Sequence, residues 1–214
     1  MSKYPRTYHL DFSPGATSDD KISKSVDSII GIDVVITEKL DGENTSMTND
    51  GVYARSHATF TTSNWSKEVR QLHDIKVRGQ LDEDTYIFGE NLEAIHSIEY
   101  GILDSYFYTF GVREKNIWLD WKSVEEYAYL LDLKVVPVLF KGIIKDKSQL
   151  ELLVNKFMSE ESLLGGEKEG IVIRNSNSFD GDFFNQNVMK YVRANHVTTD
   201  EHWSRNWKKA KIKY

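Results

Sequence analysis

The chain contains the segment Thr37-Glu38-Lys39-Leu40-Asp41-Gly42-Glu43-Asn44, which directly follows the apolar residues Val34-Val35-Ile36. The segment places one lysine beside three acidic residues at a bend that glycine permits. An ordinary lysine amine has a pKa of about 10.4, so a nucleophilic Lys39 needs desolvation or nearby cations to lower that value. Carboxylates alone would raise it, and the three acids make chemical sense if they hold a divalent metal ion that also carries a phosphate-rich substrate. The structural alternative is a salt-bridged hairpin at the surface.

The composition is typical of an ordinary soluble globular protein. The chain has 214 residues, no cysteine and a net charge of -6. Because no linker or internal repeat divides it, we expect a single domain, and without thiols it forms neither disulfides nor a thiolate zinc site. It has no apolar run that spans a bilayer and no secretory signal at its start, so we expect a cytoplasmic protein outside the membrane. The lysine-rich tail, residues 207–214, predicts either a local basic face or a solvated terminal helix or frayed end.

Apolar runs bounded by turn residues predict a structure that is rich in β-sheet. The expected strands are residues 33–39, 46–47, 52–56, 86–90, 106–111, 135–140, 169–174 and 188–193. Between the second and third of these, Asn49-Asp50-Gly51 predicts a hairpin turn, because such residues tolerate positive φ. The hairpin would put Lys39 and Arg55 on neighbouring strands. Pro137 lacks an N–H donor and therefore favours an edge position for its strand.

Three segments have helical patterns. Residues 65–72 have the spacing of an amphipathic helix. Two capping boxes, Ser123-x-x-Glu126 and Ser148-x-x-Glu151, predict the start of two further helices. Since the helices do not alternate regularly with the strands, we expect an α+β fold rather than βαβ winding.

Polar residues stand at the ends of the predicted strands. In chain order they are Lys39, Asp41, Arg55, Glu90, Glu169 and Lys190, with the aromatic Phe110 among them. Taken singly, Phe110 is better interpreted as a core residue, and Glu90 or Glu169 as a salt-bridge partner. Taken together, the series resembles the covalent nucleotidyltransferases, which include ATP-dependent ligases and mRNA capping enzymes. The matching motifs are Lys39-Leu40-Asp41-Gly42 (motif I), Phe88-Gly89-Glu90 (III), residues 107–111 (IIIa), Glu169-Gly170-Ile171-Val172-Ile173 (IV) and Met189-Lys190-Tyr191 (V).

Within that superfamily the chain is similar to RNA ligases of the nick-sealing, type 2 kind. The similarity extends to Glu43-Asn44, Tyr53-Ala54-Arg55-Ser56-His57 and His96-Ser97-Ile98-x-Tyr100. It implies an α+β nucleotidyltransferase domain, described as ATP-grasp-like, with antiparallel-rich sheets flanked by helices. It also implies a three-step reaction. Lys39 attacks the ATP α-phosphate, the lysyl-AMP passes its AMP to an RNA 5′-phosphate, and a neighbouring 3′-hydroxyl displaces AMP from this RNA-adenylate.

The resemblance further implies a role for each site residue. The catalytic residues would be Lys39, Asp41 and Lys190, the last neutralising charge on the α-phosphate. Mg²⁺, for which Mn²⁺ can substitute, would be held by Glu169 and Asp41. Phe110 would stack on adenine, Glu90 would bind a ribose hydroxyl, and Arg55 would bind ribose or phosphate oxygens. The expected ATP-binding set is Glu38, Lys39, Asn44, Arg55, Glu90, Phe110, Glu169 and Lys190.

Two features depart from the family pattern. Motif V is often Lys-x-Lys, whereas Lys190 is followed by Tyr191-Val192-Arg193. Residues 190 and 193 face opposite sides of a regular strand, so Arg193 can replace the second lysine only where the strand ends or bulges. His57 is a further candidate for contact with RNA or phosphate.

The second departure is the length of the chain after motif V. Only about twenty residues follow it, and a folded domain usually needs about 50, so we expect residues 1–214 to be one catalytic domain without a C-terminal OB or helical domain.

The expected partner is RNA, as a nicked duplex or a broken strand, bound by a monomer. A separate RNA-binding or end-healing protein is a further expected partner. Three alternatives remain open at this point: a DNA ligase, a guanylyltransferase, and a non-catalytic module that binds nucleotide or RNA in a repair complex. Labelled GTP, DNA-only nicks and the presence or absence of a lysyl adduct distinguish them.

Overall fold

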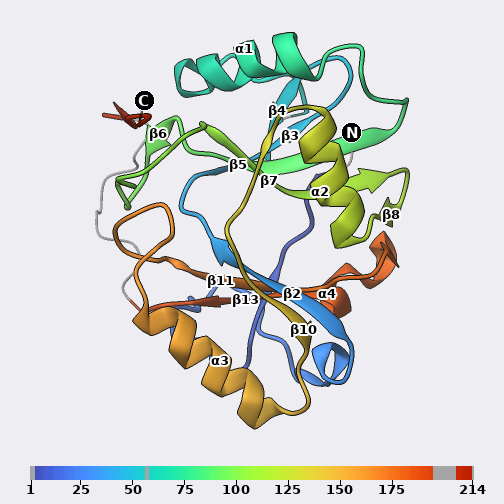
Figure 1. Ribbon diagram of the computed structural model, residues 1–214, viewed down its shortest axis with the longest axis vertical. Coiled ribbons are helices and arrows are strands. Elements are labelled where there is room, and N and C mark those ends of the chain that lie inside the picture. Colours follow the sequence, from blue (N-terminus) through green and yellow to red (C-terminus); the bar gives the residue numbers. More distant parts are fainter. Residues whose placement is uncertain (1–2, 56–57, 195–205, 214) are drawn as a thin grey trace.

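The computed structural model of the chain describes residues 3–55, 58–194 and 206–213. Two large β-sheets lie one above the other, with helices on their outer sides (Figure 1). The first sheet has the strand order β1 (Tyr8–His9), β13 (Val188–Val192), β11 (Gly170–Asn175), β2 (Asp33–Lys39) and β10 (Val138–Ile143). The second has the order β12 (Phe179–Asp180), β8 (Ile117–Trp118), β7 (Phe107–Glu114), β5 (Thr85–Asn91), β3 (Glu43–Met47) and β4 (Val52–Ala54), and β9 (Lys134–Val135) also pairs with β7.

The pairing of the strands is mostly antiparallel. Among the described strands, β1 with β13 and β7 with β9 are the parallel pairs. All other pairs are antiparallel, including the small sheet of β6 (Ala94–Ile95) with β14 (Lys208–Lys209). The expected combination of antiparallel-rich sheets and flanking helices is therefore confirmed.

Two of the helices begin earlier than the sequence predicts, whereas the first, predicted from residue 65, begins at Lys67. The helices are α1 (Lys67–Lys76), α2 (Trp121–Leu130), α3 (Lys147–Ser159) and α4 (Phe184–Asn187), with 3-10 turns at Asp27–Ile29, Asn64–Ser66 and Gly181–Phe183. The N-cap of α2 is Asp120, whose side chain accepts from Ser123 N, and the N-cap of α3 is Asp146. The two predicted capping boxes are thus wrong, because aspartate caps as well as serine does and here stands closer to the N-terminus.

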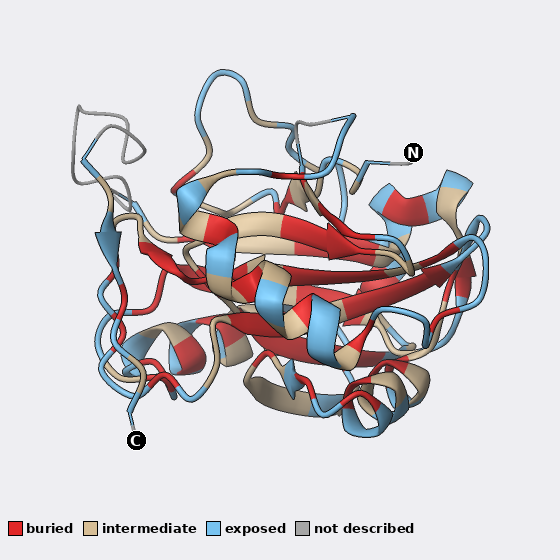
Figure 2. Cartoon of the chain, turned by 90° about the horizontal axis from the view of Figure 1, so that it is seen from above, coloured by how far each residue is buried: buried red, intermediate tan, exposed pale blue. Residues whose placement is uncertain are grey.

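Successive side chains of β2 point to opposite faces of the strand and pack into two different cores. Val34 and Ile36 lie in the core beneath α3, whereas Val35 lies in the core of the second sheet. Buried residues accordingly concentrate in the central strands, and the outer helices show mixed exposure (Figure 2). Because side chains alternate between the faces of a strand, Lys39 shares the face of Val35 and Glu38 shares the face of Val34. The charged side chains of Glu38 and Lys39 therefore lie on opposite faces of β2.

Two predictions about strand placement need correction. The predicted strand 135–140 is divided at Pro137 into β9 and β10, which belong to different sheets. The proline has no N–H for a ladder, and its carbonyl accepts a bond from Glu38 N. Lys39 and Arg55 are not on neighbouring strands, because β2 is in the first sheet while Arg55 follows β4 of the second.

The predicted hairpin of β3 and β4 is confirmed, although not for the predicted reason. Neither Asn49, Asp50 nor Gly51 has positive φ. A Cβ on Gly51 would instead lie 2.5 Å from the ring of Phe60, so close approach requires the glycine.

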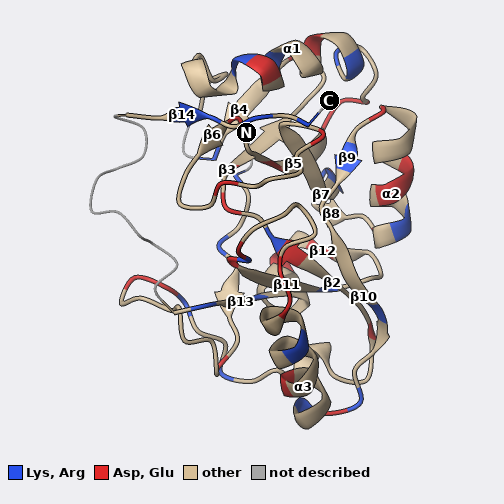
Figure 3. Cartoon of the chain, turned by 60° about the vertical axis from the view of Figure 1, so that its left-hand side comes forward, with Lys and Arg blue, Asp and Glu red and all other residues tan. Residues whose placement is uncertain are grey.

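The C-terminal tail is partly a strand rather than a helix. β14 pairs with β6, and its two lysines form a basic edge (Figure 3). Lys209 binds Glu68 of α1 at 2.7 Å, so an acidic partner on the body of the protein helps to hold the tail. Within the described ranges, the helices are too short or too polar to cross a bilayer.

Replacing Gly170 with alanine should destabilise the first sheet. A Cβ at this position would lie 2.1 Å from the carbonyl oxygen of Tyr191, which cannot move without breaking the β11–β13 ladder. We expect Gly170→Ala to lower the free energy of unfolding by about 2 to 3 kcal/mol in urea denaturation. Gly101→Ala is the matched control, because a Cβ there meets nothing within 4 Å and should change stability by less than about 0.5 kcal/mol. Equal losses in both variants would contradict this explanation.

Candidate active site

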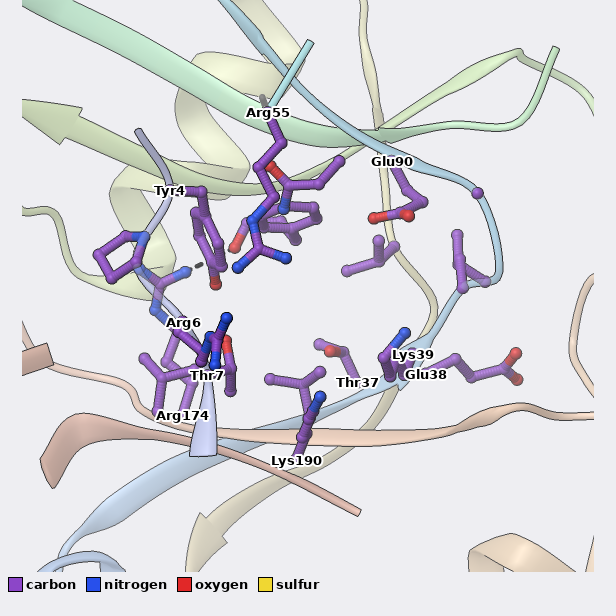
Figure 4. Close-up of a pocket in the computed structure, with 18 of the residues that line it drawn as sticks. Tyr4, Arg6, Thr7, Thr37, Glu38, Lys39, Arg55, Glu90, Arg174 and Lys190 are labelled. Atoms are coloured by element: carbon purple, nitrogen blue, oxygen red, sulfur yellow. Dashed lines mark hydrogen bonds between the residues drawn. The ribbon is translucent and has the colours of Figure 1, made fainter. Parts of the chain in front are cut away.

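A cavity of about 920 Å³ lies between the two sheets. Its floor comes from β2, β11 and β13 of the first sheet and its roof from β3, β5 and β7 of the second, and residues 3–7 close one end. Figure 4 shows its charged side chains converging from these elements. The structure brings together most of the residues singled out in the sequence: Lys39, Asn44, Arg55, Glu90, Phe110 and Lys190 all line the cavity.

Lys39 at the end of β2 forms the central ion pair of the site. Its Nζ lies 2.7 Å from each carboxylate oxygen of Glu169, and the Glu169 side chain is only 6% exposed. Burial by itself lowers the pKa of Lys39, but the charges of Glu169, Glu90 and Asp41 outweigh it and raise the pKa above its ordinary value. Lys39 is therefore an ammonium group in the protein without ligands.

Glu90 on β5 faces the same lysine from the second sheet. Burial is the largest cause that raises its pKa, to about 8; Lys39 opposes the rise, while Glu169 and Asp41 add to it. Across the β3–β5 ladder Glu90 pairs in register with Asn44. Because its pKa is raised, the carboxyl group of Glu90 is largely protonated at neutral pH.

Asp41 anchors a loop rather than facing the ion pair. Its Oδ2 accepts bonds from Ser97 N at 2.7 Å and Ile98 N at 2.8 Å, and its own N–H donates to Tyr100 Oη. These contacts connect the Lys39-Leu40-Asp41-Gly42 segment to the His96-to-Tyr100 segment that the sequence also singled out. Among the described residues, no group of three or more His, Asp or Glu side chains is arranged to hold a metal ion. The role of Asp41 as a metal ligand therefore stays a prediction, and its Oδ2 is already bound by two backbone N–H groups.

At the same bend, position 42 has no room for a side chain larger than that of glycine. A Cβ there would lie 2.4 Å from the carbonyl oxygen of Asn91 and 2.7 Å from Leu92 Cδ2. The backbone has no positive φ at this glycine, so close approach to β5, rather than an unusual dihedral angle, requires it.

Glu38 is part of the cavity lining, but its carboxylate is bound elsewhere, so its predicted role in nucleotide binding stays a prediction. It lies on the opposite face of β2 and points away from the other labelled side chains (Figure 4). It accepts from Ser162 Oγ at 2.6 Å and Leu163 N at 2.7 Å, and Lys168 Nζ lies 3.9 Å away. Glu38 thus holds the loop that leads into Glu169.

Lys190 on β13 is paired with a residue that the sequence did not single out. Its Nζ lies 3.2 Å from Asp20 Oδ1, and His9 Nε2 lies 3.3 Å from the same oxygen. Burial, and then the charge of Lys39, lower the pKa of Lys190, while Asp20 opposes this shift. No periodic pattern in the N-terminal region marks Asp20, because that region contains only the short strand β1.

One end of the cavity is aromatic and rich in arginine. The ring of Tyr4 meets Phe110 edge-on at 5.2 Å. Arg174 is buried, its Nη1 donates to the carbonyl oxygen of Phe110, and its Nε and Nη2 have no partner among the described residues. Arg6 and Arg55 approach the same region in Figure 4. The sequence reasoning missed Arg174, although alternation along β11 places it on the face of Val172, which lines the cavity.

Arg193 lies elsewhere, and His57 cannot be placed. Arg193 follows the end of β13, pairs with Glu167 and lines a separate surface hollow. The strand does end at Val192, but the arginine side chain turns away from Lys190, so the structure does not make it a second cation of the site. His57 lies outside the described residues.

The ligand-free protein should lose stability as its pH rises toward 8. Glu90 has a pKa of about 8 in the folded protein, against an ordinary value of 4.5. Between these two pH values the folded protein holds a proton that the unfolded chain releases. The corresponding stability is complete below pH 4.5 and is lost as the pH rises through about 8. Relative to wild type, Glu90→Gln should gain about 1 to 2 kcal/mol between about pH 6 and about pH 9, a range that allows for partial exposure.

Urea denaturation in EDTA at several pH values measures this difference. Glu83→Gln, an exposed loop residue, serves as the control and should follow the wild-type pH dependence. If Glu90→Gln also follows the wild type, Glu90 does not carry the raised pKa.

Comparison with known proteins identifies the family of the chain and proteins that share its fold. A model of the RNA ligase family matches residues 32–192. The fold is similar to a mutant Naegleria gruberi RNA ligase with ATP and Mn (TM-score 0.62, 18% identity, 92% of this chain and 57% of that chain). It is also similar to the Naegleria gruberi RNA ligase with PPi (TM-score 0.61, 19% identity, 90% and 56%) and to another mutant with AMP and Mn (TM-score 0.61, 18% identity, 90% and 56%).

No curated protein gives a significant match. The chain spans less than two thirds of the solved ligase structures that it resembles, and their low identity shows a shared fold only. The family match carries more weight, because it covers most of the chain, from just before β2 to the end of β13, and includes Lys39, Glu90, Glu169 and Lys190. On this match, the chain belongs to the RNA ligase family.

Proposed function

We propose that this chain is the catalytic domain of an ATP-dependent RNA ligase that joins 3′-hydroxyl and 5′-phosphate ends through lysyl-AMP and RNA-adenylate intermediates. The observation that carries the proposal is the position of Lys39, which pairs with Glu169 beside a cavity that also contains Lys190. A lysine enclosed with a second cation can attack a bound phosphate whose charge that cation stabilises. Membership of the RNA ligase family supports the same activity.

The first step would form the bond between lysine and nucleotide. The neutral amine of Lys39 attacks the α-phosphorus of ATP, the N–P bond forms, and the bond from that phosphorus to the β-phosphate oxygen breaks. Pyrophosphate leaves with the electron pair. The ammonium group must first lose a proton to water, and a cation that shields Glu169, at 2.7 Å from the amine, would favour this loss because it lowers the pKa of Lys39. Lys190 would stabilise the charge that develops on the α-phosphate oxygens.

A divalent cation fits this site beside Glu169 rather than beside Asp41. Mg²⁺ commonly binds one or two carboxylates together with waters and substrate phosphates, so a cluster of three protein ligands is not required. Glu169 directs both oxygens toward the Lys39 amine, whereas Asp41 uses Oδ2 for two backbone N–H groups. When bound, the cation would neutralise the carboxylate charge that raises the pKa of Lys39. Mn²⁺ would replace Mg²⁺ in this role.

The adenosine would lie between the two sheets. Phe110 of β7 and Val172 of β11 line the cavity from opposite sheets, which suits an aromatic base between two apolar surfaces. Glu90 and Asn44 stand together on the roof and would accept or donate hydrogen bonds to the ribose. Arg55 would contact ribose or phosphate oxygens through its fork of donors.

The proposal also includes the fold class, the substrate, the cellular location and a partner protein. The domain would have a nucleotidyltransferase fold of the ligase type and act as a single adenylyltransferase unit. Its substrate would be a nicked RNA duplex or a broken strand, joined by a monomer in the cytoplasm. A separate RNA-binding or end-healing protein is the proposed partner, and the basic edge of β14 offers one surface for RNA phosphates.

Loss of Lys39 should abolish the covalent step. With α-labelled ATP and Mg²⁺, the wild type should become labelled, and Lys39→Ala should retain less than about 1% of that labelling, because it lacks the nucleophile. Lys141→Ala is the control, since Lys141 pairs with Glu125 at 2.6 Å on the exposed side of the protein. Equal labelling of wild type and Lys39→Ala would exclude Lys39 as the nucleophile.

The same assay separates the alternatives. Labelling from GTP instead of ATP would favour a guanylyltransferase, and faster sealing of DNA-only nicks than of RNA nicks would favour a DNA ligase. Binding of nucleotide without any lysyl adduct would favour a non-catalytic module.

Loss of the Phe110 ring should weaken ATP binding more than chemistry. Stacking of a base on an aromatic ring contributes about 1 to 3 kcal/mol, so Phe110→Ala should raise the KM for ATP by about 5- to 100-fold with a smaller change in kcat. Phe110→Tyr, which keeps the ring, should stay close to wild type. An unchanged KM in Phe110→Ala would place the base elsewhere in the cavity.

A further inference from the structure

We propose that Asp20 is a positioning residue for the ligase reaction, which holds the ammonium group of Lys190 in the cavity where the α-phosphate would bind. The proposal rests on the proposed function. It also gives a purpose to the N-terminal strap, which we define as residues 8–23. This strap contains little regular structure, yet residues 8–15 are bonded to β13, and Lys21 and Ser23 are bonded to His9.

The strap fixes the backbone of β13 on both sides of Lys190. β1 pairs in parallel with β13 and places His9 opposite Lys190. Leu10 N then donates to Lys190 O at 2.8 Å, and Gly15 N donates to Val192 O at 3.0 Å. Val192 N in turn donates to Ser13 Oγ at 3.0 Å. The segment that carries Asp20 therefore cannot shift without also disturbing the strand that carries Lys190.

The carboxylate of Asp20 is held from both of its oxygens. Oδ2 accepts from Thr17 N at 3.1 Å and from Thr17 Oγ1 at 3.0 Å, which closes a tight turn. This leaves Oδ1 to face Lys190 Nζ at 3.2 Å and His9 Nε2 at 3.3 Å. Because the turn fixes the carboxylate before any contact with Lys190, Asp20 can impose a position on the longer and more flexible lysine side chain.

The position of Lys190 needs such support, because the other charges around it do not fix it. Lys39 lies in the same cavity and repels it, and burial disfavours its charged form. Glu169 attracts Lys190, but both oxygens of Glu169 are bound by Lys39. Asp20 is thus the carboxylate with a direct contact to Lys190 among the described residues. A simple stabilising role is the alternative, and it predicts effects that do not depend on Lys190.

A double-mutant cycle distinguishes the two roles. Asp20→Asn keeps the shape of the side chain and an oxygen for the Thr17 turn but removes the charge. We expect it to lower kcat for lysyl-AMP formation by about 10- to 100-fold, measured in single turnover with labelled ATP, with a change in KM for ATP of less than about 3-fold. In a Lys190→Ala background, the same substitution should change the rate by less than about 2-fold, because the group that it positions is absent.

Two further variants control the experiment. Asp11→Asn removes the other ion pair of the strap, between Asp11 and Lys147 at 2.6 Å, and should leave the rate near wild type. Asp20→Glu retains the charge and should recover at least part of the rate. Thermal unfolding of each variant shows whether the fold is intact.

Different results would overturn the positioning role of Asp20 and the ligase proposal. Equal rate losses in the wild-type and Lys190→Ala backgrounds, or a wild-type or faster rate for Asp20→Asn, would overturn the positioning role while leaving the ligase proposal in place. Absence of any labelling of the wild type would instead overturn the ligase proposal itself.

Discussion

The ion pair between Lys39 and Glu169 is the constraint on which the chemistry of this site depends. Each oxygen of Glu169 lies 2.7 Å from the Lys39 amine, and the charge of Glu169 is the largest cause that raises the pKa of this amine. The pairing keeps the amine protonated and therefore unreactive in the absence of ligands. If Lys39 is the nucleophile, as proposed, its reaction must begin with a change in the charge around Glu169, and a cation would then take part in activation as well as in substrate binding.

Much of the fold and part of the site follow from the two-residue period of strands. The apolar runs at β2, β11 and β13 were predictable, and so was the placing of their polar residues along one cavity. The same period separates Glu38 from Lys39 and puts Arg174 on the face of Val172, although the sequence prediction treated Glu38 as a nucleotide ligand and passed over Arg174. Arg174 was missed because residues were selected by motif without asking which face of the strand they occupy.

Other features depend on contacts that no local pattern reveals. The carboxylate of Asp41 has its partners more than fifty residues away, at Ser97 and Ile98, in a segment after β6 that has no regular structure. Asp20 lies 170 positions before Lys190 and outside any regular element. Pro137 divides a predicted strand between two sheets only because both sheets are there to receive the halves. Tertiary packing decides each of these cases, and single-sequence propensity has no access to it.

Lys39 and Lys190 form ion pairs that differ in distance and exposure, and this difference suits two different roles. Lys39 has two oxygens at 2.7 Å from a carboxylate that is 6% exposed, and its pKa is raised. Lys190 has one oxygen of Asp20 at 3.2 Å, that carboxylate is 24% exposed, and the pKa of Lys190 is lowered. A phosphate can compete for the weaker partnership without a cation, whereas releasing Lys39 requires Glu169 to be neutralised. Anchoring of a phosphate by Lys190 can therefore precede exposure of the nucleophile, and free Lys39 would arise only when its target is already in place.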